Sequence, residues 1–116
     1  MAKSTNGKIC YVEIPAEDIK KSADFYAKVF GWEIKKRGDG STAFDDPVGG
    51  VSGTWVVKRT VATKPGMLVY IMVDSISATT EKIVREGGSI MRVHTPEIAH
   101  FSDPASNILG LYQEPS

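Results

Sequence analysis

An internal repeat constrains the fold of this chain more than any other feature of its sequence. When residues 11–55 are placed over residues 68–112, a shift of 57 positions without gaps, eight pairs are identical. Ordinary residue frequencies would give roughly 3 identities by chance. Both halves also carry the pattern Phe-x-Asp-Pro with a glycine six residues later, ending at Gly53 and at Gly110. A repeat of this length indicates that one supersecondary unit has been duplicated.

The first half is predicted to form a strand, a helix and three further strands. Asp18 can cap the helix, and Gly31 can end it because glycine tolerates a positive φ. Strand formers alternate between turn residues in four segments, which are 8–15, 32–37, 41–45 and 51–58.

The second half repeats this order. The helix cap is Asp74 or Ser75, and the helix reaches about Glu86 before two glycines. Four strands are predicted, at 67–73, 89–94, 98–102 and 107–113. We therefore predict a single α+β domain over residues 1–116, with tandem βαβββ units at 8–58 and 67–114 and a linker at 59–66.

Two such units are expected to share one core, since about 50 residues cannot bury enough apolar surface alone. Their sheets would form a curved, mixed half-barrel with the helices outside. Because side chains alternate along a strand, Cys10, Val12 and Ile14 are predicted to face the helix. The opposite face would line an inner trough and bind a ligand, and its candidate residues are Tyr11, Glu13, Trp55, Tyr70, Met72 and Tyr112. Core filling and a dimer contact remain the alternatives for this aromatic surface.

Composition narrows the classes of function. Fourteen basic residues balance fourteen acidic ones, which argues against a nucleic-acid or membrane-surface partner. No apolar run has the length of a membrane span, and the first residues do not form a secretory signal, so a cytoplasmic protein is predicted. The one cysteine, Cys10, excludes an internal disulfide framework and is interpreted as a small buried hydrophobic residue.

Several motifs resemble one protein family. They are Tyr11-Val12-Glu13-Ile14-Pro15, Phe25-Tyr26, Phe30-Gly31-Trp32, Val73-Asp74 and Phe101-Ser102-Asp103-Pro104-Ala105-Ser106-Asn107. The chain resembles the vicinal oxygen chelate superfamily, which includes glyoxalases, bleomycin-resistance proteins and ring-cleaving dioxygenases. The resemblance covers residues 8–114 and departs at Ser106, where the family usually has glycine.

The resemblance implies a divalent metal held by inward side chains of both units. Its four ligand positions fall at Tyr11, Gly53, Leu68 and Gly110. Glycine and leucine offer no donor atom, and neutral tyrosine is a poor ligand for Zn²⁺ or Ni²⁺. We therefore predict no metal site and no cofactor, which argues against a metal-dependent glyoxalase or dioxygenase reaction.

Two residues are weak candidates for catalysis. Glu13 is an inward carboxylate among aromatic residues and could act as a base or bind a cation. The alternatives are a strand-end residue that is partly solvated at the mouth of the trough, or one that is paired with an arginine or lysine. His100 could act as an acid or base near the trough, whereas a surface histidine is the simpler interpretation.

Three classes of function stay open. The resemblance favours a protein that binds a small apolar or aromatic molecule in the trough without a metal. A metal-independent lyase or isomerase that uses Glu13 or His100 is the second, and an accessory or regulatory domain with a structural inner face is the third. A homodimer is also predicted, because the open trough would expose more apolar surface than monomers usually do.

Overall fold

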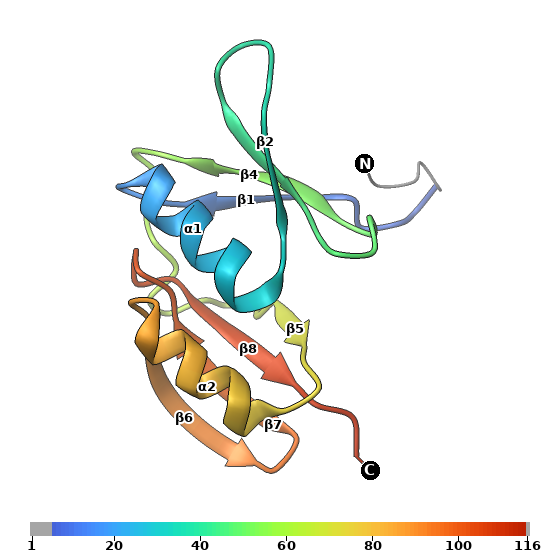
Figure 1. Ribbon diagram of the computed structural model, residues 1–116, viewed down its shortest axis with the longest axis vertical. Helices are drawn as coiled ribbons and strands as arrows, with labels where there is room; N and C mark the ends of the chain where they lie inside the picture. The colour runs from blue at the N-terminus through green and yellow to red at the C-terminus, as the bar shows by residue number, and fades with distance from the viewer. Residues whose placement is uncertain (1–5, 116) are drawn as a thin grey trace.

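The computed structural model describes residues 6–115. Over that range the elements follow one another as β1 (Tyr11–Pro15), α1 (Ile19–Phe30), β2 (Glu33–Lys36), β3 (Thr42–Asp45), β4 (Ser52–Val56), β5 (Tyr70–Met72), α2 (Ile76–Arg85), β6 (Ser89–Thr95), β7 (Ile98–Ser102) and β8 (Ile108–Tyr112). The strands form two mixed sheets, ordered β1-β4-β3-β2 and β5-β8-β7-β6. In Figure 1, α1 lies in front of the first sheet and α2 in front of the second. The predicted α+β fold of two βαβββ units is confirmed.

The helix ends follow the capping residues that the sequence indicates. Asp18 accepts a hydrogen bond from the backbone N–H of Lys21 at 3.1 Å, and Gly31 ends α1 with φ of 74°. Of the two candidate caps for α2, Ser75 fills the position, and its Oγ accepts from the N–H of Ala78 at 3.1 Å. Neither described helix has the length and apolarity that crossing a bilayer requires.

Helix α1 joins the two halves through one aromatic core. Tyr26 stacks on Trp32 with ring centroids 4.5 Å apart, and Trp32 stacks on Phe44 of β3 at 4.4 Å. On the other side of α1, the ring of Phe25 lies 6.2 Å from that of Phe101 on β7. The same helix therefore covers its own sheet and also contacts the second one.

The strand registers show that the repeat is not a uniform shift of 57 positions. Ile14 pairs with Trp55 in the first sheet, whereas the corresponding Ile71 pairs with Leu111 in the second. Trp55 therefore corresponds to Leu111, 56 positions later, and not to Tyr112. The extra residue is Gly50, because the first Asp-Pro turn closes one residue later than the second.

This extra residue reverses the predicted face of β4. A Cβ atom at Gly53 would overlap the ring of Phe44 in the core, whereas one at Gly110 would meet the ring of the half-exposed Tyr70. The two glycines thus face opposite sides of their sheets. Trp55 accordingly packs against Tyr26 and Phe44 and is 3% exposed, so the expectation that it faces the trough is wrong.

Cys10 also differs from the sequence interpretation, because it is exposed rather than buried. The first strand begins at Tyr11 instead of residue 8. Burial falls from Ile14 through the half-buried Val12 to Cys10, which lies beyond the part of the sheet that the core covers.

Candidate functional site

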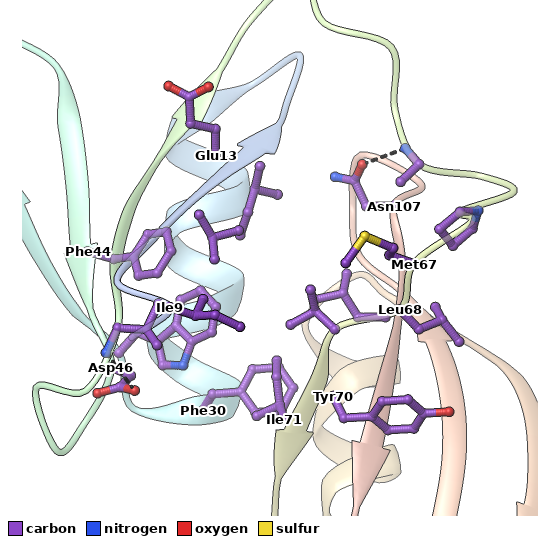
Figure 2. Close-up of a pocket in the computed structure, with 18 of the residues that line it drawn as sticks. Ile9, Glu13, Phe30, Phe44, Asp46, Met67, Leu68, Tyr70, Ile71 and Asn107 are labelled. Atoms are coloured by element: carbon purple, nitrogen blue, oxygen red, sulfur yellow. Dashed lines mark hydrogen bonds between the residues drawn. The ribbon is translucent and has the colours of Figure 1, made fainter. Parts of the chain in front are cut away.

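A cavity of about 820 Å³ lies between the two halves of the molecule. In Figure 2, Ile9 and Phe44 approach it from the first half, and Met67 and Leu68 approach it from the second. Most of the remaining wall is also apolar and includes Val12, Ile14, Phe30, Trp32, Val69, Ile71 and Leu109. A cavity of this size and character is typical of small-molecule binding sites.

The cavity exists because β1 and β5 are edge strands that do not pair with each other. Among the described residues, each is hydrogen-bonded on one side only, β1 to β4 and β5 to β8, in parallel register. The carbonyl of Cys10 and the N–H of Ala16 bond toward β4. Backbone groups alternate in direction along a parallel strand, so those of Tyr11 and Glu13 point to the unpaired edge.

The same alternation holds on the opposite wall. The carbonyl of Val69 and the N–H of Val73 bond to β8, which directs the backbone groups of Leu68, Tyr70 and Met72 to the unpaired edge. Two strand edges with unused amide groups therefore border an otherwise apolar cavity.

The two acidic side chains of the wall already have partners. The Glu13 carboxylate accepts a hydrogen bond from the Arg59 guanidinium at the rim. Both carboxylate oxygens of Asp46 accept backbone N–H groups, from Gly50 at 2.7 Å and from Val51 at 3.2 Å.

Asn107, the one amide side chain of this wall among the described residues, is fully used as well. Its Nδ2 donates to the carbonyl of Pro15 at 2.7 Å and to Asp103 at 3.0 Å, and its Oδ1 accepts from the N–H of Ala62 at 2.9 Å. Figure 2 shows the bond to Ala62 as a dashed line. Asn107 thus fixes the linker against the end of β1.

The predicted ligand-binding residues do not form one wall. Glu13, Tyr70 and Met72 line the cavity. Tyr11 is 43% exposed outside it and lies under the Arg37 guanidinium, 5.3 Å from the ring centroid. Tyr112 is half-buried opposite Met72 in the neighbouring strand.

His100 belongs to a hydrogen-bonded chain on the open face of the second sheet. Its Nε2 lies 3.1 Å from the Tyr70 hydroxyl, and its Nδ1 lies 3.1 Å from Nε2 of His94. Burial, together with His94 and Arg92, lowers the pKa of His100 below 6.5. In Figure 2 the Tyr70 hydroxyl points away from the cavity, so these hydrogen-bonded side chains lie outside it.

The structure also adds residues that the sequence reasoning missed. Phe30, Phe44 and Asn107 line the cavity, although the sequence places them in the core or in a turn. Met67 belongs to the same wall and follows directly after the linker. The apolar run Met67-Leu68-Val69 beside a polar linker was the one available signal for this wall.

No group of three or more His, Cys, Asp or Glu side chains within residues 6–115 is arranged to hold a metal ion. The register of the strand pairs also changes one of the four metal-ligand positions that the resemblance implies. The residue that corresponds to Gly110 is Thr54 rather than Gly53, and its Oγ1 donates to the carbonyl of Thr42 at 2.6 Å.

Comparison with known proteins gives one consistent result. Residues 8–108 match the family model described as the Glyoxalase/Bleomycin resistance protein/Dioxygenase superfamily. A "Glyoxylase-like domain-containing protein" of Didymella fabae is 31% identical over 127 residues, covering 95% of this chain and 96% of that protein.

Solved structures agree with this family in their fold. TnmS3, an antibiotic binding protein from Streptomyces sp. CB03234, has a TM-score of 0.68 at 25% identity, with 99% of each chain covered. The fosfomycin resistance protein FosX from Listeria monocytogenes has a TM-score of 0.75 at 15% identity, covering 96% of this chain and 94% of that one.

Proposed function

Because the chain belongs to the Glyoxalase/Bleomycin resistance protein/Dioxygenase superfamily, we propose that it binds a small apolar or aromatic molecule without a metal cofactor. The observation that carries this proposal is the cavity of about 820 Å³ between β1 and β5. Its wall is mainly aliphatic and aromatic, so a ligand would gain affinity by removing apolar surface from water.

The comparison with TnmS3 supports this function, since that protein is described as antibiotic binding and matches this chain along nearly its whole length. FosX provides a contrast in metal binding, because a variant of it is described in complex with Mn(II). In our chain, the ligand positions that the family resemblance implies are Tyr11, Leu68 and Gly110, with Thr54 replacing Gly53 once the strand register is applied. Leu68 and Gly110 have no side-chain donor, and the Thr54 hydroxyl is buried and bonded. These residues do not fit a metal centre.

A homodimer is part of this proposal. The segment that leads into and forms β5 exposes Met67 at 90%, Val69 at 49% and Met72 at 56%. A second copy would remove part of this exposed apolar surface from water. We further propose that the chain is one cooperative domain that works in the cytoplasm, where a single exposed thiol such as Cys10 stays reduced.

Binding can be tested with a neutral fluorescent probe such as Nile red and a variant that fills the cavity. Leu68→Trp places a large side chain into the wall at a half-buried position. We expect saturable binding to the wild-type protein and a loss of about tenfold or more in affinity in the variant. Val84→Trp is the matched control, because Val84 is 60% exposed on α2 and does not line the cavity. Equal affinity in all three proteins would refute the proposal.

A further inference from the structure

The part of the cavity wall that the structure describes offers a ligand no free charged side chain. Its two acidic residues lie at opposite ends, Glu13 at the top and Asp46 at the bottom of the view in Figure 2. Glu13 is paired with Arg59, and Asp46 is bonded to two backbone N–H groups. Lys8 lies beside the Asp46 turn, where its ammonium bonds the carbonyl of Gly50. Within residues 6–115, no lysine, arginine or histidine lines the cavity.

The free hydrogen-bonding groups of the wall are uncharged. The backbone N–H and C=O groups of Glu13, Leu68, Tyr70 and Met72 point to the unpaired strand edges that border the cavity. A hydroxyl, carbonyl or amide on a ligand could bond to these groups. A formal charge would lose part of its hydration against an apolar wall and find no free counter-charge there, which is costly.

We infer that the cavity is specific for uncharged apolar molecules and discriminates against both anions and cations of the same shape. This inference rests on the proposed binding function and adds the chemical class of the ligand. Shape and apolar area would supply the affinity, and the strand edges would orient neutral polar groups.

Three pyrene derivatives with the same ring system test this inference by fluorescence titration. They are 1-pyrenemethanol, which is neutral, 1-pyrenemethylammonium and 1-pyrenesulfonate. We expect the neutral compound to bind at least about tenfold more tightly than either ion, since an unpaired charge in an apolar site is strongly disfavoured. Equal or tighter binding of an ion would overturn the inference and leave the proposed function standing. Binding of none of the three would refute the proposed function itself.

A charged variant links the selectivity to this wall. Leu68→Lys adds a cation to the half-buried wall position, and its long side chain can keep the ammonium near water. We expect the affinity of this variant for the sulfonate to rise about tenfold relative to its affinity for the neutral compound. Val84→Lys adds the same charge at an exposed position on α2 and should leave the ratio unchanged. Equal ratios in both variants would show that the probes bind elsewhere and would overturn the inference.

Discussion

Replacing Asn107 with alanine tests whether one buried amide holds the two halves together. Asn107 is 2% exposed and makes hydrogen bonds to Pro15 in β1, to Ala62 in the linker and to Asp103 in the turn before β8. The variant would leave the half-buried carbonyl of Pro15, the half-buried N–H of Ala62 and a buried carboxylate oxygen of Asp103 without this partner. Two neutral hydrogen bonds contribute about 1 kcal/mol each and one to a carboxylate about 2 kcal/mol, so the free energy of unfolding should fall by about 4 kcal/mol.

Urea unfolding at pH 7, followed by circular dichroism and tryptophan fluorescence, measures this loss. Asn6→Ala is the control, because Asn6 is exposed, and it should change stability by less than about 0.5 kcal/mol. Tyr26→Phe removes one hydrogen bond to the same Asp103 oxygen, 2.8 Å long, and should cost about 2 kcal/mol. Since both side chains share that oxygen, the double variant should depart from additivity. A loss below about 1 kcal/mol for Asn107→Ala would refute the proposed role of this amide.

Four further outcomes are expected. Burial and the neighbouring Asp103 hold the pKa of Tyr26 well above 10, so the free energy of unfolding should fall as pH rises above 10. Tyr26→Phe should flatten that decline in urea titrations between pH 9 and pH 11, and an unchanged slope would contradict this. A hydrogen bond from Lys35 is the main cause that lowers the pKa of Asp45 from 3.8, so the stability that this carboxylate contributes is present above pH 3.8 and lost as pH falls further. Lys35→Met should therefore reduce the acid-induced loss below pH 4, as measured by thermal melts. Light scattering at micromolar concentration should give the mass of a dimer that Met72→Lys weakens, whereas a persistent mass near 12.6 kDa would rule the dimer out. Calorimetric titration with Zn²⁺, Ni²⁺, Mn²⁺ and Fe²⁺ should show no stoichiometric site, and submicromolar binding lost on mutating a cavity residue would contradict the metal-free proposal.

The sequence predicts the order of elements well because local signals and the repeat agree. Asp18 and Gly31 mark the ends of α1, and the predicted strand at 98–102 matches β7 residue for residue. The sequence predicts some strands too long at their ends. The first strand is predicted at 8–15, whereas β1 begins at Tyr11. Strand ends depend on which backbone groups find partners across the sheet, and that information is not local.

The side-chain faces of β4 could not be predicted from the repeat alone. An alignment without gaps matches Gly53 to Gly110, and both sit after the same Asp-Pro turn. A one-residue difference in a turn reverses every side chain in the strand that follows, because the side-chain period of a strand is two. Gly50 is such a residue, and it places Trp55 in the core while Gly110 faces the open side.

The cavity itself follows from how the two halves share their core. Phe25 and Phe30 of α1 both contact Phe101 of the second sheet, so the helix holds the two sheets together from one side. The edge strands β1 and β5 therefore do not have to pair with each other to hold the halves together. The apolar residues beside these strands line the cavity. The cavity takes its wall from both halves, so a pattern repeated in each half predicts a shared trough but does not identify all the residues that line it. The proposed binding site is thus a property of the junction, and it includes matching residues of both halves, such as Val12 with Val69 and Ile14 with Ile71.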